Sequence, residues 1–299
     1  MQLSSILAAT ALLCASALHA QPTSAALTTD PAPDKTNPAT MQSFQLPSHG
    51  AMLNALVYVA AGAGPHPVVI LLHGFPGNEK NLDLAQSIRR AGWDVLYFDY
   101  RGSWGSPGDF SFTHSIEDTQ AAIAYMRNPA NAKSLRANPA YIVLIGHSMG
   151  GFMARYVAAN DPAVKAVGLI SAADMGVDQL QPVPENQRRL ALHPIASSLA
   201  AEGMAPLAGC TPASLAEEII VNANAWNTVN LAPKLATRPV LVITSNDGLA
   251  PSNDAFFAAL QKTGDTQVQE IHMDTDHSYS DHRIALQQAI LDGLATLQQ

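Results

Sequence analysis

The sequence is poor in cysteine and in charged residues. Only two cysteines, Cys14 and Cys210, occur among its 299 residues, so a fold held together by a disulfide framework is excluded. Charged residues make up 13% of the chain, about half of the usual share. No run of basic residues is present and the net charge is −8, which argues against a nucleic-acid partner.

Long apolar runs are also scarce. A membrane-spanning helix needs about 20 apolar residues, and the apolar stretch from Ile6 to Leu18 is shorter than that. Its composition and the small residues that follow it resemble a secretory signal, although no Lys or Arg stands near Met1. We therefore expect a signal peptide over residues 1–20, with Ala17 as an alternative cleavage position. A buried N-terminal helix is the other interpretation.

The expected signal peptide leads to a prediction of location. Cys14 lies inside the signal, so the exported chain would keep the single thiol of Cys210 and no internal disulfide. Leu13 precedes Cys14 at a position where a lipoprotein signal has a small residue, which argues against a lipid anchor. We expect a bacterial protein that is periplasmic or secreted, without a stable membrane anchor.

The next segment lacks any regular period. Residues 21–40 are rich in Pro, Thr and Ala, which predicts a flexible leader before a domain over residues 41–299. Two strands, SFQLP and MLNALVYVA, open that domain and are joined by a short turn at residues 48–51.

From residue 67 onward, apolar strands alternate with helical segments. The predicted strands cover residues 67–74, 94–102, 141–146, 163–173, 239–246 and 268–273, and the predicted helices cover 82–92, 115–128, 149–160, 252–264 and 281–298. Ser115, with Asp118 three residues later, predicts the start of the second helix. The alternation predicts an α/β fold, a mostly parallel sheet with helices on both faces.

One long segment interrupts this alternation. Residues 174–236 are too many for a structureless loop, and they contain patches with helical spacing. We expect an inserted helical lid above the ends of the strands. A separate domain is less favoured, because a short segment rich in Ala and Pro buries little apolar surface.

A serine flanked by glycines lies between a predicted strand and a predicted helix. The stretch reads Gly146-His147-Ser148-Met149-Gly150. So tight a turn strains the serine backbone, needs small neighbours and raises the hydroxyl above the sheet edge. The N-terminus of the following helix favours negative charge at the same place. These features predict that Ser148 is a nucleophile rather than a serine of an ordinary turn.

A nucleophilic serine needs a base. His277 follows the last predicted strand, at the carboxyl edge where open α/β sheets carry their sites, so we expect it to be the base. His282 is the alternative, at the start of the final helix. His272 lies within the strand and is expected to point into a packed face. His147 adjoins the nucleophile, and we expect it to pack or to form a hydrogen bond.

The base needs an acid that orients it. Asp247 comes directly after the apolar run PVLVITSN, at the same edge of the sheet, and is our candidate. Asp254, on the next helix, and Asp276, beside the histidine, are less well aimed.

A glycine-rich loop after an earlier strand predicts an oxyanion hole. In LLHGFPGN, Gly74 and Gly77 allow the main chain to approach a ligand closely. Pro76 has no N–H, so Phe75 is the expected donor from this loop. The second expected donor is the N–H of Met149, the residue after the serine.

The chain order Ser148, Asp247, His277, together with HGFPGN, GHSMGG, SNDGLAP and TDHSYSDHR, resembles the α/β-hydrolase family over residues 42–298. The resemblance implies the α/β-hydrolase fold and an acyl-enzyme mechanism with no metal and no organic cofactor. The stretch FDYRGSWGSPG, residues 98–108, is similar to a loop that many members carry beside the site, and we expect Arg101 and Gly102 to stabilise it.

Hydrolysis of a carboxylic ester, with a small-molecule acyl substrate, is the function that we favour. The alternative is a serine peptidase or aminopeptidase of the same fold. An aminopeptidase would need carboxylates in the lid to hold a free amine, and several are available there: Asp174, Asp178, Glu185, Glu202, Glu217 and Glu218. A binding protein without chemistry is the third interpretation, although such proteins usually lose a member of the triad.

Overall fold

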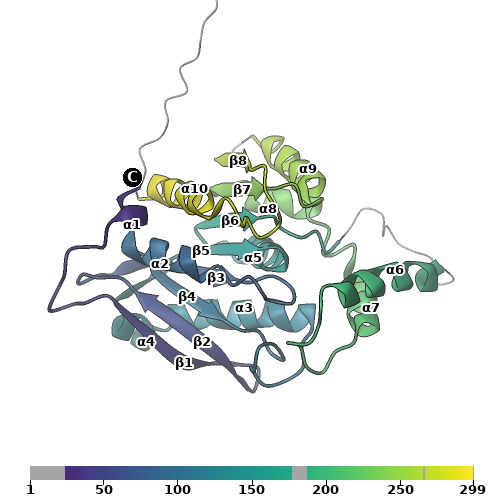
Figure 1. The fold of residues 1–299 in the computed structure, drawn as a ribbon, viewed down its shortest axis with the longest axis horizontal. Helices are drawn as coiled ribbons and strands as arrows, with labels where there is room; N and C mark the ends of the chain where they lie inside the picture. Colours follow the sequence, from purple (N-terminus) through teal and green to yellow (C-terminus); the bar gives the residue numbers. More distant parts are fainter. Residues whose placement is uncertain (1–23, 177–186, 265–266, 299) are drawn as a thin grey trace, which may run out of the picture.

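The computed structural model describes residues 24–176, 187–264 and 267–298 (Figure 1). The expected signal peptide at residues 1–20 lies outside these ranges. No helix within them is long and apolar enough to cross a bilayer.

The described residues form one eight-stranded sheet in the order β1-β2-β4-β3-β5-β6-β7-β8. Its strands are β1 (Thr40–Ser48), β2 (Ala51–Val59), β3 (His66–Leu72), β4 (Asp94–Phe98), β5 (Ala137–His147), β6 (Ala166–Ile170), β7 (Val240–Thr244) and β8 (Val268–His272). The expected hairpin is confirmed, since β1 pairs antiparallel with β2, and β2 pairs antiparallel with β4. All pairings from β4 to β8 are parallel, so the predicted fold class is confirmed.

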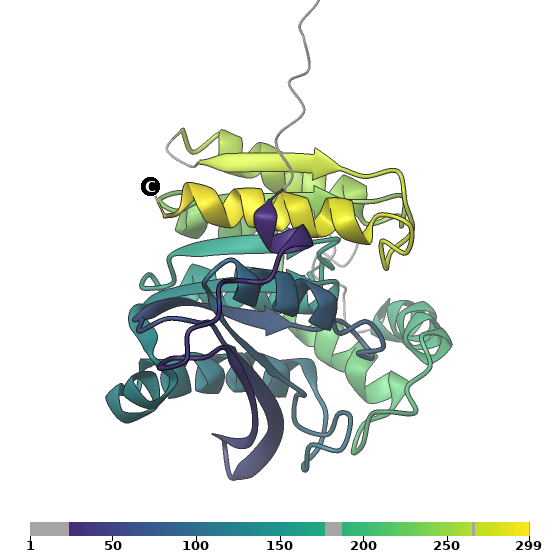
Figure 2. The same cartoon turned by 60° about the vertical axis from the view of Figure 1, so that its left-hand side comes forward.

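Helices cover both faces of the sheet. The helices of the described residues are α1 (Ala25–Thr28), α2 (Leu82–Arg90), α3 (Phe112–Arg127), α4 (Pro129–Leu135), α5 (Met149–Asn160), α6 (Arg188–Ala201), α7 (Pro212–Asn222), the 3-10 turn η3 (Val229–Leu231), α8 (Ala232–Leu235), α9 (Ala250–Gln261) and α10 (Arg283–Thr296). One face carries α2 and α10, with α1 beside them, and the other carries α3, α5, α8 and α9 (Figure 1 and Figure 2).

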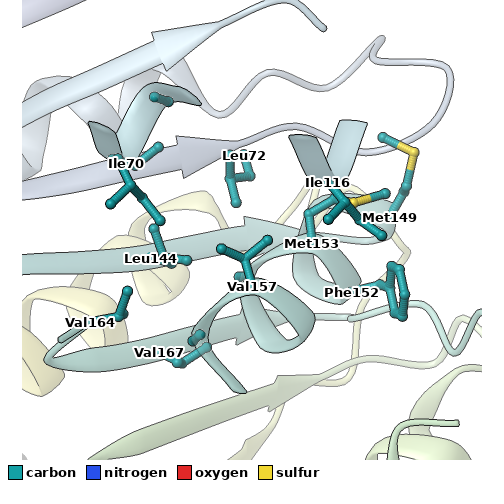
Figure 3. Close-up of a cluster of buried hydrophobic side chains, with 14 of the residues drawn as sticks. Ile70, Leu72, Ile116, Leu144, Met149, Phe152, Met153, Val157, Val164 and Val167 are labelled. Carbon is teal, nitrogen blue, oxygen red and sulfur yellow. The ribbon is translucent and has the colours of Figure 1, made fainter. Parts of the chain in front are cut away.

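The core explains why the strands read as continuous apolar runs. Every residue of β4, β6 and β7 is buried, because each of these strands faces a helical layer on both sides. Figure 3 shows how α5 fills one layer, where Phe152, Met153 and Val157 lie beside strand residues such as Leu144 and Val167. This packing fixes α5, and with it the turn that precedes the helix.

Part of the segment expected to be a flexible leader forms a short helix that packs on the domain. Residues 25–28 form α1, in which Ala26 is buried. Arg90 Nε donates a hydrogen bond to the Ala26 carbonyl at 2.5 Å, and Gln288 Oε1 accepts one from the Ser24 N–H at 2.8 Å. Contacts with α2 and α10 order this segment, and a local period could not reveal them.

The start of α3 also differs from the prediction. The helix begins at Phe112, and the Ser111 side chain caps it by accepting from the His114 N–H. Ser115 is one turn inside the helix, where its hydroxyl donates to the Ser111 carbonyl. Asp118 does not complete a cap, because its buried carboxylate binds Arg101.

The segment at residues 174–236 carries the helices α6, α7, η3 and α8 between β6 and β7, and residues 177–186 lie outside the described ranges. α6 and α7 stand at the right of the layered body in Figure 1. Glu218 of α7 accepts hydrogen bonds from the N–H groups of Phe112 and Thr113 at the start of α3. Ser103 and Leu207 form an isolated antiparallel bridge. The insert is therefore attached to the loop that precedes α3.

Candidate active site

Ser148 lies between the end of β5 and the start of α5. Its φ of 55° and ψ of −122° are unusual for a residue with a side chain and mark a strained turn. Main-chain hydrogen bonds hold it there: the Ser148 N–H donates to the Ile170 carbonyl at 2.9 Å, and the Ser148 carbonyl accepts from Ala173 at 2.9 Å. The strained turn predicted from the glycine pattern is present.

The glycines around Ser148 are required by contact with the neighbouring main chain. A Cβ on Gly150 would stand 2.1 Å from the Leu72 carbonyl oxygen, and one on Gly146 would stand 2.0 Å from the Gly150 carbonyl oxygen. A Cβ on Gly151 would collide with Ala172. The first turn of α5 therefore packs directly on β3 and β6, which no larger residue permits.

Asp247 and His277 meet across the loops that follow β7 and β8. His277 Nδ1 and Asp247 Oδ2 are 2.7 Å apart. Burial alone would raise the pKa of Asp247, but hydrogen bonds from His277, Ser171 and the Leu249 N–H outweigh it and hold the pKa below its usual value. A carboxylate only accepts hydrogen bonds, so the His277 proton sits on Nδ1 and Nε2 is left as an acceptor.

A group of hydroxyls behind this pair was missed by the sequence analysis. Ser171 Oγ is 3.0 Å from Ser245 Oγ and 2.9 Å from the Tyr279 hydroxyl, and all three side chains are buried. Ser171 also bonds to Asp247. The only signal in the sequence was position, since Ser171 directly follows β6 at the carboxyl edge of the sheet and Tyr279 follows His277 by two residues.

His147 contacts both the main chain and the ring of His277. His147 Nε2 lies 2.8 Å from the His277 carbonyl oxygen, and the two imidazole rings lie against each other, tilted by 35°, with centroids 4.6 Å apart. Burial, followed by the nearby His277, lowers the pKa of His147 to about 3. The expected packing or hydrogen-bonding role is confirmed, and a neutral ring avoids repulsion when His277 gains a proton.

Ser148 and His277 line the same cavity of about 140 Å³, together with Phe75, Gly77, Glu202 and other residues of the adjoining loops. Within the described ranges, no hydrogen bond joins Ser148 Oγ to His277.

The loop that we expect to form the oxyanion hole, residues 74–77 (the oxyanion loop), lies against Ser148. A Cβ on Gly74 would stand 2.9 Å from the Ser148 Cβ, so the main chain of the loop approaches Ser148 as closely as a glycine allows. Phe75, which follows it, lines the cavity. In the part of the chain that the structure describes, the N–H groups of Phe75 and Met149 donate to no protein acceptor, so both are free to bind a ligand oxygen.

The alternative histidines and aspartates do not take part in the contact between His277 and Asp247, and the expectation for His272 is wrong. His272 does not point into a packed face: it is exposed at the sheet edge and bonds to Thr244 and Asn246, because β8 is the last strand and lacks a neighbour on one side. His282 precedes α10 and pairs with Asp281. Asp254 and Asp276 are both exposed.

The loop beside the site is held as expected. The Arg101 N–H and Nε bind the two oxygens of Asp118 at 2.8 and 2.7 Å. Gly102 has a φ of 66°, and a Cβ on it would stand 2.2 Å from the Phe110 nitrogen. Both residues thus stabilise the loop before α3.

Comparison with known proteins supports the same family. A family model for the alpha/beta hydrolase fold matches residues 67–200. The chain is 34% identical over 103 residues to an sn-1-specific diacylglycerol lipase, ABHD11, of Xenopus tropicalis, covering 34% of this chain and 30% of that protein. It is 29% identical over 119 residues to an uncharacterized protein, Rv2307c, of Mycobacterium tuberculosis, covering 40% of this chain and 41% of the relative. The match thus spans less than half of these curated relatives.

Solved structures agree over most of the chain. An esterase from Pyrobaculum calidifontis has a TM-score of 0.64 at 20% identity, covering 88% of this chain and 87% of that one. The carboxylesterase EstE1 from a metagenomic library has a TM-score of 0.60 at 20% identity, covering 86% and 90%. At this identity the likeness concerns the fold. Together with the family model over residues 67–200 and the strand order, it shows that the chain has the α/β-hydrolase fold.

Proposed function

We propose that the protein is a serine hydrolase that cleaves carboxylic esters through an acyl-enzyme intermediate. The observation that carries the proposal is the hydrogen bond between His277 and Asp247 at the rim of a cavity that Ser148 also lines. Similarity to proteins named as esterases and as a lipase supports ester chemistry in general.

The mechanism follows from the tautomer of His277. Ser148 Oγ attacks the ester carbonyl while His277 Nε2 accepts the hydroxyl proton, and Asp247 stabilises the imidazolium that forms. The N–H groups of Phe75 and Met149 bind the negative oxygen of the tetrahedral intermediate. When the intermediate collapses, the C–O bond of the ester breaks and His277 returns the proton to the leaving alcohol.

Deacylation repeats these steps with water. His277 removes a proton from the water as it attacks the acyl carbonyl, and the same two N–H groups bind the oxyanion. The carboxylic acid leaves and Ser148 Oγ recovers its proton from His277. The cavity of about 140 Å³ has room for a small acyl group, so acetyl and propionyl esters are the first substrates to assay.

The test is a comparison of the wild type with Ser148→Ala. We expect p-nitrophenyl acetate turnover and covalent labelling by a fluorophosphonate probe in the wild type, and neither in the variant. Equal labelling of the two proteins would remove Ser148 from the mechanism.

A second function, that of an aminopeptidase, is favoured by one residue. Glu202, from the end of α6, lines the cavity with Ser148, and its carboxylate is suited to a free amine. Asp178 and Glu185 lie outside the described ranges, and Glu218 is engaged at the start of α3. Rapid cleavage of aminoacyl p-nitroanilides without turnover of esters would reverse our order of the two functions.

We keep two further expectations as proposals, namely that the insert acts as a lid and that the protein is exported from a bacterial cell. Export is tested by cell fractionation and by N-terminal sequencing of the recovered protein. A chain that begins after Ala20 or Ala17 in the periplasm or the medium would support it.

A further inference from the structure

We propose that Trp104 is a positioning residue, whose indole N–H holds the oxyanion loop in the orientation that aims the Phe75 N–H at the substrate. The inference rests on the proposed function and gives a role to Trp104, which lies in the stretch at residues 98–108 where the sequence analysis singled out only Arg101 and Gly102. Trp104 is not among the described residues that line the active-site cavity, so it acts through the loop and not by contact with the substrate.

Two hydrogen bonds hold the carbonyls on either side of Phe75. Trp104 Nε1 donates to the Pro76 carbonyl oxygen at 2.8 Å. His73 Nδ1 lies 2.7 Å from the Gly74 carbonyl oxygen, which belongs to the same planar peptide group as the Phe75 N–H. His73 fixes one end of the Phe75 segment and Trp104 fixes the other, so the direction of the Phe75 N–H depends on both.

The loop fits closely between these two side chains. Gly77 has a φ of 101°, and a Cβ built on it would stand 2.6 Å from Trp104 Nε1 and 2.7 Å from His73 Nδ1. The indole and the imidazole therefore both approach the main chain at Gly77. The loop has little freedom to rotate while Trp104 remains in place.

Trp104 is itself fixed by groups from two other parts of the chain. Its main-chain N–H donates to the Pro206 carbonyl of the helical insert at 3.0 Å, next to the bridge between Ser103 and Leu207. Lys80 Nζ stands 4.5 Å from the centroid of its ring and 3.0 Å from Asp99. Trp104 is 37% exposed, so core packing alone does not explain its position.

The test is Trp104→Phe, which keeps an aromatic ring and removes the donor. A misplaced oxyanion donor weakens binding of the tetrahedral state more than binding of the substrate. We expect kcat for p-nitrophenyl acetate to fall about tenfold, with KM changed by less than about twofold. The Ki of a trifluoromethyl ketone, which forms a tetrahedral adduct with the serine, should rise by the same factor as kcat falls.

Trp93→Phe is the matched control, because Trp93 is buried against Tyr141 in the core layer that contains α2 and α10, whereas Phe75 of the loop packs against the other layer. We expect it to lower the melting temperature, while kcat and Ki stay within about twofold of the wild type. Gly77→Ala is a second variant, in which the new Cβ collides with Trp104 Nε1 and His73 Nδ1, displaces the loop from them and should also lower kcat and raise Ki.

The outcomes separate the inference from the function on which it rests. Normal kcat and Ki in Trp104→Phe would overturn the role of Trp104, while the enzyme itself would stand. Should Trp104→Phe fail to fold, an unchanged Ki in Gly77→Ala would overturn the role just as well. The proposed function fails on a different result, namely hydrolysis of p-nitrophenyl acetate by the Ser148→Ala protein.

Discussion

Replacing Asp247 by Asn tests the orientation of His277. Both oxygens of the Asp247 carboxylate accept hydrogen bonds from N–H groups: Oδ1 from the Leu249 N–H at 2.9 Å, and Oδ2 from His277 Nδ1 at 2.7 Å. An asparagine has only one oxygen, so its NH₂ group must face one of these two donors.

The two donors differ in whether they can give up their proton. The main-chain N–H of Leu249 keeps its proton, whereas an imidazole can move its proton from Nδ1 to Nε2. We therefore expect the introduced amide to accept from Leu249 and to donate to an unprotonated His277 Nδ1. His277 Nε2 would then carry the proton and could not take one from Ser148.

We expect this variant to lose about 10³- to 10⁴-fold in kcat, because the wrong tautomer removes the base while the oxyanion donors stay in place. The assay is the steady-state hydrolysis of p-nitrophenyl acetate at about pH 8, with far-UV circular dichroism as the check on folding. Asp276→Asn is the matched control, since Asp276 adjoins His277 in sequence but is exposed and accepts from Ser280. A folded Asp247→Asn protein with more than about a tenth of the wild-type kcat would refute the reasoning.

Two further predictions concern buried groups. In His147→Phe the His277 carbonyl loses its donor, so we expect kcat to fall about tenfold; a pH–rate profile and kcat identical to the wild type would show that His147 does not position His277. Burial raises the pKa of Asp94 to about 7 against the effect of the Ala60 N–H, so the folded state binds this proton more tightly than the unfolded chain. The protonated Asp94 carboxyl therefore contributes fully to the free energy of unfolding below about pH 4, and this contribution is lost as the pH rises through about 7. Relative to Asp94→Asn, wild-type stability in urea should therefore drop by a few kcal/mol between about pH 4 and about pH 8, and parallel curves for the two proteins would contradict this.

Local sequence patterns predicted most of the framework. Continuous apolar runs marked the strands from β3 to β7, because a strand buried on both faces has few polar positions to interrupt the run. The turn at Ser148 could also be predicted, because this tight turn has room only for glycines at positions close to the serine in sequence. His277 and Asp247 followed from position, because the ends of parallel strands meet at one edge.

Contacts between distant segments decided what the patterns could not. α3 begins at Phe112, after the Ser111 cap, and Asp118 binds Arg101 instead of completing a cap; residues 24–28 rest on α2 and α10. His272 is exposed because its strand turned out to be the last of the sheet.

The sequence by itself determined the order of strands and helices, the strained serine turn and the histidine and aspartate that follow the last two strands. Only the tertiary structure decided how these groups are supported, through His147 beneath His277, the hydroxyls behind Asp247, and Trp104 and His73 on either side of the oxyanion loop. The physical reason is distance along the chain. Residues within one turn or strand restrict each other's backbone and leave a pattern, whereas a hydrogen bond such as that from Trp104 to Pro76 depends on where two separate segments pack.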